Sequence, residues 1–386
     1  MKKTISVILA AMLIIAVTPL AVFAEDVNGG AVAVSAKSAI LVEVESGRVL
    51  FSKNPDEKLP PASITKIMSL LLVMEALDDG KITIDEVVTA TKNAASKAGS
   101  QIWLEEGEKM TVNELLKATA IASANDACTA LGEHIAGDEQ AFVALMNERA
   151  KQLGMKNTNF ENCTGLDDTV TNHYTTASDV AIMTCELIKH KKIRDYTTVW
   201  MDSLRNGKTE LVNTNRLVRF YEGTTGLKTG TTSKAGYCVS ATAEREGLHL
   251  AAVVLGGTDS TERFEDAKKM LNWGFANFSL YTPSPDPALI TGVGVLMGET
   301  DSIMPYADKM PSVIVKKGSE DNITQRVDLC VDVEAPVEKN QKLGTVYFEL
   351  DGKVICECAL KSPVRVERRG FFFVFSALWS SFAKKS

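Results

Sequence analysis

Two pairs of strand-like segments lie at opposite ends of the first 280 residues, and this separation constrains the fold more than any other feature. Residues 38–44 and 48–52 form a predicted hairpin, and residues 236–243 and 248–255 form a second one. Helical patterns fill the interval and also follow the second pair, over residues 67–78, 111–122, 124–136, 139–153, 176–190 and 262–277. We therefore expect an α+β fold, in which one antiparallel sheet is assembled from both ends around a helical insertion.

The chain is long enough for a second domain, and its boundary is marked by proline. Three prolines alternate with other residues in the segment 281–287, which is typical of a linker. Residues 288–366 lack helical periodicity and contain short alternating runs. We expect a first domain over residues 25–280, a linker over 281–287 and a small all-β domain over 288–366.

The amino terminus has the pattern of a secretory signal. Lys2 and Lys3 precede an apolar run from Ile5 to Phe23, and Ala24 offers a small residue for cleavage. The alternative is an uncleaved anchor helix, since the run approaches the length that spans a bilayer. We expect a cleaved signal over residues 1–24, and in either case the rest of the chain is exported.

The carboxyl terminus, residues 367–386, combines basic flanks with dense aromatic residues. Arg368 and Arg369 precede the aromatic run and Lys384 and Lys385 follow it. The apolar part is too short to span a bilayer, so we expect an amphipathic helix lying in an anionic membrane interface. The alternative is a segment packed on the protein itself.

Bulk properties exclude several classes of function. The net charge of -7, with no long basic run, argues against a nucleic-acid partner. Four histidines without a His-Glu-x-x-His pattern, and seven cysteines without a Cys-x-x-Cys pair, indicate neither a metal site nor a cofactor. Most cysteines lie in apolar stretches, so we expect buried free thiols.

Ser63-Ile64-Thr65-Lys66 places a hydroxyl and an amine three residues apart at the expected start of a buried helix, so both project from one face. A serine nucleophile needs a partner that takes its proton, and a lysine can do so only if burial or a nearby cation keeps its amine neutral. A chance copy of the pattern, Ser381 to Lys384, lies in the tail without a second element near it.

Two further motifs are ambiguous when taken alone. Ser123-Ala124-Asn125 offers a hydroxyl for proton relay and an amide for a substrate carbonyl, although Ser123 could equally cap a helix. Lys228-Thr229-Gly230-Thr231, just before the strand that begins near Gly236, suits an anionic carboxylate, although a glycine-bearing strand entry with a surface lysine explains it as well.

The order of the three motifs resembles that of the penicillin-binding proteins and serine β-lactamases. In detail the chain resembles the low-molecular-mass penicillin-binding proteins, the serine-type D-alanyl-D-alanine carboxypeptidases of peptidase family S11, over residues 34–366. The stretches that carry the resemblance include Leu59 to Lys66, Ala122 to Ala127, Asn162 to Leu166, Thr176 to Asp179, Gly226 to Thr232, and Arg263-Phe264 leading into Leu271 to Phe275.

The resemblance implies a β-lactamase/transpeptidase-like catalytic domain and a mechanism. Ser63 attacks the carbonyl of the penultimate D-alanine of a peptidoglycan stem peptide, and Lys66 accepts its proton. The backbone amides of Ser63 and Thr231 form the oxyanion hole. Ser123 protonates the departing D-alanine, and Asn125 positions the peptide.

The resemblance assigns Lys228, Thr229, Gly230 and Thr231 to substrate binding, with the terminal carboxylate held by Lys228 and Thr229. The positive field of Lys228 helps to keep Lys66 neutral. Arg263 is a candidate for a second carboxylate contact, with a surface salt bridge on the last helix as its alternative. Binding of β-lactam antibiotics to the serine, and a location at the outer face of the cytoplasmic membrane or the cell wall, are also implied.

Two other functions are alternatives to a carboxypeptidase: a class A β-lactamase and a non-catalytic wall-binding protein. A class A β-lactamase needs a glutamate-activated water, and the segment Asn162 to Asp168 contains no Glu-x-x-x-Asn. A non-catalytic wall-binding relative would retain the fold without the activity, although all the motif residues are intact.

Overall fold

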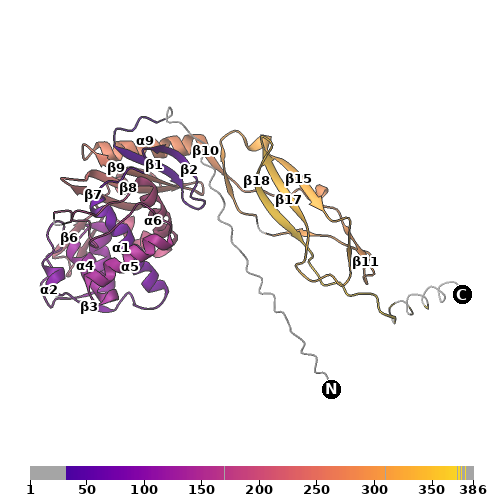
Figure 1. Ribbon diagram of the computed structural model, residues 1–386, viewed down its shortest axis with the longest axis horizontal. Coiled ribbons are helices and arrows are strands. Elements are labelled where there is room, and N and C mark those ends of the chain that lie inside the picture. Colours follow the sequence, from indigo (N-terminus) through magenta and orange to yellow (C-terminus); the bar gives the residue numbers. More distant parts are fainter. Residues whose placement is uncertain are drawn as a thin grey trace, which may run out of the picture.

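The computed structural model describes residues 32–168, 170–308, 310–371, 373, 375 and 379. The expected signal over residues 1–24, and most of the expected tail helix, lie outside the described residues. Figure 1 shows two bodies: a mixed helix and sheet body that ends with α9, and a β body that follows it.

The first body is built on a five-stranded sheet with the strand order β2-β1-β9-β8-β7, in which every pairing is antiparallel. The strands are β1 (Ser38–Glu43), β2 (Val49–Lys53), β7 (Thr224–Thr232), β8 (Gly236–Arg245) and β9 (Leu248–Gly257). The predicted assembly from the two sequence ends is confirmed. Strand β7 was missed, because glycines and threonines leave it without the apolar alternation that marks a strand.

The sheet is covered on both faces, which explains why β9 is continuously apolar from Leu250 to Leu255. Ala251, Val253 and Leu255 pack into the large cluster that contains the helical insertion. The alternate residues of β9, including Leu250 and Val254, pack beneath α9 (Glu262–Asn277). Because successive side chains of a strand point to opposite faces, a strand buried on both faces needs a continuous apolar run.

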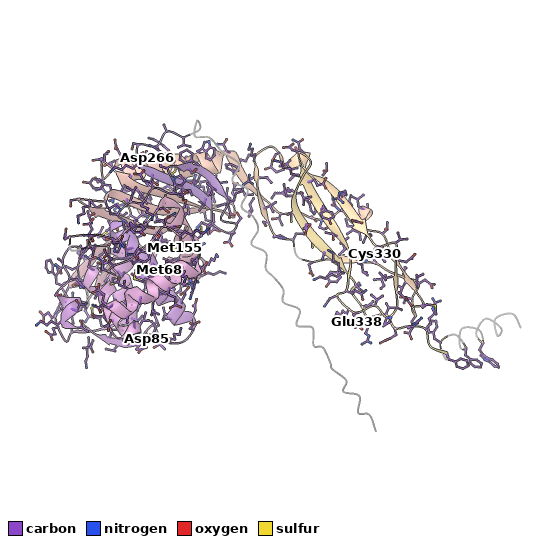
Figure 2. All side chains as sticks on the ribbon, viewed as in Figure 1. Met68, Asp85, Met155, Asp266, Cys330 and Glu338 are labelled. Carbon is purple, nitrogen blue, oxygen red and sulfur yellow. The ribbon has the colours of Figure 1, made fainter. Side chains whose placement is uncertain are left out.

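The helical insertion surrounds one buried helix, α1 (Lys66–Asp78), which contains Met68 (Figure 2). Its other helices are α2 (Lys92–Ala95), α3 (Val112–Ile121), α4 (Asn125–Ala136), α5 (Glu139–Gln152), α6 (Ala177–Lys189), η2 (Lys191–Ile193), α7 (Arg194–Thr197) and α8 (Leu217–Phe220). Two small two-stranded sheets accompany them, β3 (Val87–Thr89) with β4 (Lys109–Thr111) and β5 (Met201–Leu204) with β6 (Thr209–Val212). Thr111 and Glu114 form a capping box at the start of α3.

Helix α9 also fixes the segment that enters the sheet. The carboxylate of Asp266 accepts hydrogen bonds from the backbone N–H of Ser35 at 2.9 Å and of Ala36 at 3.0 Å (Figure 2). Asp266 is buried, and these charge-assisted bonds satisfy its carboxylate.

The second body consists of short strands around two small cores. Strand β10 (Phe278–Tyr281) leaves α9 and pairs with β14 (Val313–Lys316). The remaining elements are β11 (Val293–Leu296), β12 (Ser302–Ile303), β13 (Tyr306–Ala307), β15 (Thr324–Leu329), β16 (Asp332–Glu334), β17 (Lys342–Leu350), β18 (Lys353–Lys361), η3 (Pro287–Leu289) and η4 (Glu320–Asn322). This organisation matches the all-β character expected for residues 288–366.

All seven cysteines are free, and six of them are buried. Cys356 and Cys358 lie on one face of β18 and enter the same core, as their spacing predicts. Cys330 differs from the expectation and is exposed (Figure 2). No helix within the described ranges is both long and apolar enough to cross a membrane.

Candidate active site

Ser63 lies in a short 3-10 turn, η1 (Ala62–Thr65), that leads directly into α1. The sequence placed it at the start of the helix, and the two preceding prolines account for the difference because they delay regular helix formation. Ala62 has φ of 49°, a conformation that costs a non-glycine residue on the order of 1 kcal/mol. The turn brings Lys66 Nζ to 2.9 Å from Ser63 Oγ.

Lys66 is completely buried and is held by three oxygen atoms. Its ammonium donates to Ser63 Oγ, to Asn125 Oδ1 at 2.5 Å and to the carbonyl oxygen of Thr164 at 2.9 Å. Burial lowers the pKa of Lys66 to about 8, while Cys128, Cys163 and Asp126 oppose the shift. A substantial fraction of Lys66 is therefore neutral near physiological pH, as a general base requires.

Ser123 lies between α3 and α4, and the side chain of Asn125 contacts the Lys66 amine. Asn125 is the first residue of α4, and its amide donates to the carbonyl oxygen of Ala98 while its Oδ1 accepts from Lys66. Ser123 has φ of 64°, so the backbone is strained at this motif too. Its hydroxyl forms no hydrogen bond with any residue in the described part of the chain.

Asp126 holds the segment that contains Ser123 and Asn125 in position, a role that was not predicted from the sequence. The carboxylate of Asp126 accepts hydrogen bonds from the backbone N–H of Ile102 at 3.1 Å and of Leu104 at 3.0 Å. It thereby fastens the loop before β4 to the start of α4. The sequence signal was an acidic residue in the first turn of a helix, which by itself predicts only an interaction with the helix dipole.

Gly230 brings the edge of β7 against the serine turn. A Cβ atom at Gly230 would lie 2.9 Å from the carbonyl oxygen of Pro61 and 3.0 Å from the backbone nitrogen of Ser63. Only glycine permits this approach without displacement of one of the two backbones. The Lys-Thr-Gly strand and the turn that carries Ser63 therefore lie in direct contact.

Lys228 is a second buried lysine of this site, and its amine donates to the carbonyl oxygen of Thr229 at 3.1 Å. Burial, followed by repulsion from Lys66, lowers the pKa of Lys228 well below its ordinary value. We expected Lys228 to keep Lys66 neutral. In the structure, burial is the principal cause of the lowered pKa of Lys66, and burial followed by repulsion from Lys66 lowers the pKa of Lys228.

Arg263 reaches from α9 to the same strand. Its guanidinium donates to Thr231 Oγ1 at 2.9 Å and to the carbonyl oxygens of Gly230 and Cys238. The alternative surface salt bridge on α9 is not formed with any described carboxylate. Thr229 donates to the hydroxyl of Thr214 at 2.7 Å, which brings in a residue that carried no sequence signal.

The loop after α5 packs against η1, the turn that carries Ser63. A Cβ atom at Gly165 would lie 1.8 Å from the carbonyl oxygen of Ala62, so this loop packs directly on η1. His173 Nε2 lies 2.8 Å from Thr65 Oγ1, and its Nδ1 accepts from the backbone N–H of Glu161. Because Nδ1 is an acceptor, Nε2 carries the proton and donates to Thr65.

The chain is similar to known proteins along nearly its whole length. Residues 24–259 match the family described as Peptidase_S11, D-alanyl-D-alanine carboxypeptidase, and residues 278–368 match the penicillin-binding protein 5 C-terminal domain. The D-alanyl-D-alanine carboxypeptidase DacF of Bacillus subtilis is 41% identical over 376 residues, which is 96% of each chain.

Two solved structures show the same similarity. Penicillin-binding protein 5 from Haemophilus influenzae is 32% identical with a TM-score of 0.74, over 87% of this chain and 98% of that one. Penicillin-binding protein D2 from Listeria monocytogenes, in its ampicillin-bound form, is 33% identical with a TM-score of 0.58, over 63% of this chain and 98% of that one. The chain belongs to the D-alanyl-D-alanine carboxypeptidase family, peptidase S11.

Proposed function

We propose that this protein is a serine D-alanyl-D-alanine carboxypeptidase, which removes the terminal D-alanine from peptidoglycan stem peptides through an acyl-enzyme on Ser63. One observation carries the proposal. A fully buried lysine amine lies 2.9 Å from a serine hydroxyl, and burial lowers the pKa of that amine to about 8. This pair supplies a nucleophile together with the base that activates it.

Acylation uses the groups around that pair. Ser63 Oγ attacks the carbonyl carbon of the penultimate D-alanine, and its proton moves to Lys66 Nζ. The backbone N–H groups of Ser63 and Thr231 stabilise the oxyanion, an arrangement supported by the close approach of Gly230 to Ser63. When the C–N bond breaks, the amine of the leaving D-alanine receives a proton through Ser123.

The substrate is held by its terminal carboxylate and its peptide. Lys228, Thr229 and Thr231 bind the carboxylate, with Arg263 behind Thr231. A bound anion raises the pKa of Lys228 and restores its positive charge. Asn125, which is fixed between Lys66 and the loop at Ala98, positions the peptide.

Water hydrolyses the acyl-enzyme and regenerates Ser63. The segment Asn162 to Asp167 offers Lys66 a carbonyl oxygen, that of Thr164, where a class A β-lactamase would use a glutamate-activated water. We therefore expect penicillin to acylate Ser63 and to be released slowly. The Listeria relative with ampicillin bound supports penicillin as a ligand.

We further propose that the protein is exported and lies on the outer face of the cytoplasmic membrane. The signal-like amino terminus supports export. At the other end, the aromatic rings of Phe371, Phe375 and Trp379 are exposed and stack at four-residue intervals. An exposed aromatic face between basic flanks suits an anionic membrane interface.

Incubation of the purified protein with a peptide ending in D-alanyl-D-alanine tests the proposed activity. Release of D-alanine and a penicillin adduct located on Ser63 by mass spectrometry are the expected results. Absence of both would support the non-catalytic reading, and rapid turnover of penicillin would support the β-lactamase. A Ser63→Ala variant that still formed the adduct would show that a different serine is the nucleophile.

A further inference from the structure

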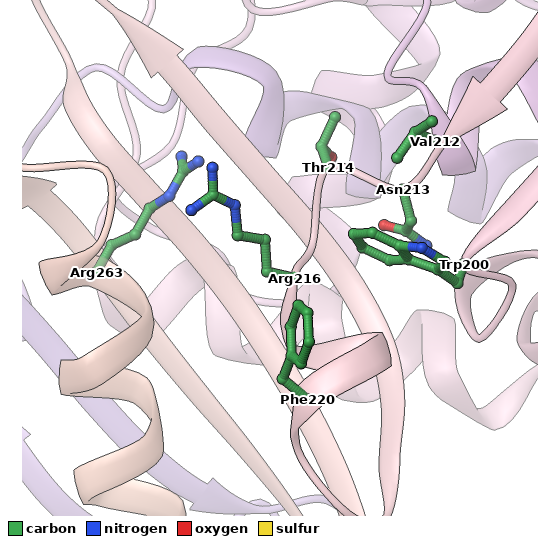
Figure 3. Close-up of a pocket in the computed structure, with 7 residues that line it drawn as sticks. All are labelled: Trp200, Val212, Asn213, Thr214, Arg216, Phe220 and Arg263. Atoms are coloured by element: carbon green, nitrogen blue, oxygen red, sulfur yellow. The ribbon is translucent and has the colours of Figure 1, made fainter.

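A pocket of about 650 Å³ opens beside the Lys-Thr-Gly strand, and the reaction as described above leaves it unused (Figure 3). Two arginines, three apolar side chains and a threonine contribute to its lining: Arg216, Arg263, Trp200, Val212, Phe220 and Thr214. The pocket is thus partly apolar and partly cationic.

The pocket is continuous with the carboxylate-binding part of the active site. Thr214 lines it and accepts the hydrogen bond from Thr229. Arg263 lines it and donates to Thr231. A substrate whose terminal carboxylate is held by Thr229 and Thr231 therefore places its last residue at the mouth of this pocket.

The charge of the pocket is not neutralised within the described part of the chain. Figure 3 shows the guanidinium groups of Arg216 and Arg263 facing one another. Arg216 is exposed and forms no hydrogen bond or ion pair through its side chain with a described residue, while the hydrogen bonds of Arg263 go only to neutral oxygens. After burial, repulsion from Arg216 is one of the causes that lower the pKa of Arg263.

A third cation and apolar walls complete the environment. The guanidinium of Arg219 lies 5.6 Å from the ring centroid of Trp200 and 5.5 Å from that of Phe220, without an ion pair to any described carboxylate. Phe220 is 65% exposed and Val212 is 45% exposed. Apolar walls with unpaired cations suit a ligand that has methylene groups and an anionic end.

The size of the pocket exceeds what the leaving D-alanine requires. The methyl side chain of D-alanine fills only a small part of 650 Å³ and offers no charge to Arg216. A leaving residue with a longer, acidic side chain would use both features, since its α-carboxylate would occupy the site at Thr229 and Thr231 while its second carboxylate met Arg216.

We propose that this pocket is a subsite for the side chain of the leaving D-amino acid, and that Arg216 selects a leaving residue with an acidic side chain such as D-glutamate. The inference rests on the proposed carboxypeptidase function and extends its substrate class. The reaction is the same hydrolysis: water adds across the D-alanyl amide bond, and the acidic D-amino acid leaves as a free amine.

Four peptides with a common acyl part ending in D-alanine, and with D-alanine, D-glutamine, D-glutamate or D-lysine as the last residue, test this assignment. D-Glutamine is the neutral isostere of D-glutamate, so the ratio of their kcat/KM values isolates the charge. In the wild-type protein we expect this ratio to favour D-glutamate about tenfold, the effect of one charge-assisted hydrogen bond. The ratio should fall to about one in Arg216→Gln, and Arg216→Glu should instead favour D-lysine over D-glutamine.

Lys208→Gln is the matched control, because it removes one exposed positive charge from the neighbouring hairpin outside the pocket. It should leave all the kcat/KM values unchanged. A wild-type ratio of one, or a ratio that Arg216→Gln leaves unchanged, would overturn the inference while release of D-alanine still supported the proposed function. Failure to release D-alanine from the first peptide would instead refute the proposed function.

Discussion

At the scale of single residues, Lys66 illustrates how burial changes the chemistry of a side chain. A lysine at the surface is protonated at neutral pH and cannot act as a base. The amine of Lys66 is excluded from water but retains three oxygen partners, so its pKa falls to about 8. The protein therefore has a neutral amine available without the cost of leaving it unpaired.

The pH dependence of the acylation rate should follow the ionisation of the Lys66 amine. Because neutral Lys66 is the active form, the second-order rate constant for penicillin should rise with pH and level off above an apparent pKa of about 8. Lys66→Arg, whose side chain stays protonated, should lower the rate about 10³-fold or more at every pH. Lys81→Arg, at the exposed surface, should reproduce the wild-type profile. A rate that is flat between pH 6 and pH 10 would contradict this role of Lys66.

His173 predicts a pH dependence of stability. Burial lowers the pKa of His173 to about 4, whereas an unfolded histidine has a pKa near 6.5. Between these values the unfolded state binds more protons than the folded state, so the free energy of unfolding decreases as pH falls through this window, by up to about 3 kcal/mol for this one group. His249 behaves in the same way, with a pKa of about 4.

Urea denaturation between pH 7 and pH 4 measures this effect. We expect His173→Gln to be less stable than the wild type at pH 7, because it disturbs the hydrogen bonds to Thr65 and Glu161, and to lose less stability on acidification. His249→Gln should also reduce the acid sensitivity. An unchanged pH slope in both variants would show that other groups control acid denaturation.

At the scale of elements, the site depends on two close backbone contacts. Gly230 allows β7 to approach η1, and Gly165 allows the loop after α5 to pack on Ala62. These contacts hold the serine turn between a strand and a loop. The strained φ angles of Ala62 and Ser123 persist because the surrounding structure over-determines them.

Gly230→Ala tests the contact between β7 and η1. The added methyl group would lie within 3.0 Å of backbone atoms of Pro61, Ser63 and Ile64, so the strand or the turn must shift. We expect the kcat/KM for D-alanine release to fall about 10²-fold, since small displacements of reacting groups have effects of this size. Circular dichroism should show a folded protein.

Gly292→Ala is the control for this substitution. Its nearest neighbour, the carbonyl oxygen of Ile303, would lie 3.8 Å from the new methyl group, which is an ordinary contact. Activity should remain at the wild-type level. Equal activities of the two variants would mean that the approach of β7 to Ser63 is not required for catalysis.

At the scale of the whole molecule, the catalytic groups lie in the first body, and the second body follows it in the chain and precedes the tail (Figure 1). The start of the tail is joined to the second body, because the backbone N–H of Arg369 donates to the carbonyl oxygen of Met297 at 2.8 Å. An anchor at the tail would therefore hold the second body next to the membrane.

Truncation after residue 366 tests the anchor. The shortened protein should move from the membrane fraction to the soluble fraction and should keep the wild-type kcat/KM for D-alanine release, because no residue of the active site is removed. Replacement of the exposed rings of Phe371, Phe375 and Trp379 by serine should have the same effect on partitioning. Continued sedimentation of both variants with membranes would place the anchor elsewhere in the chain.

Much of the fold could be predicted because it depends on local patterns. The apolar runs of residues 38–44 and 248–255 located the central strands. Strand β7 was not predicted, because Gly226 and Gly230 interrupt the apolar pattern by which a strand is recognised. Both glycines instead allow the backbone to approach neighbouring segments closely.

Ser63, Lys66, Asn125 and Lys228 were candidates from sequence because their side-chain chemistry, their spacing and their order along the chain carry information that does not depend on folding. The neighbouring groups that hold these side chains in position could not be predicted from the sequence. The carbonyl oxygen of Thr164 reaches Lys66 across 98 residues, and Thr214 and Arg216 border the site without any motif of their own. Backbone groups are identical at every position, and a pKa depends on exclusion from water, so these features are decided only when distant segments pack together.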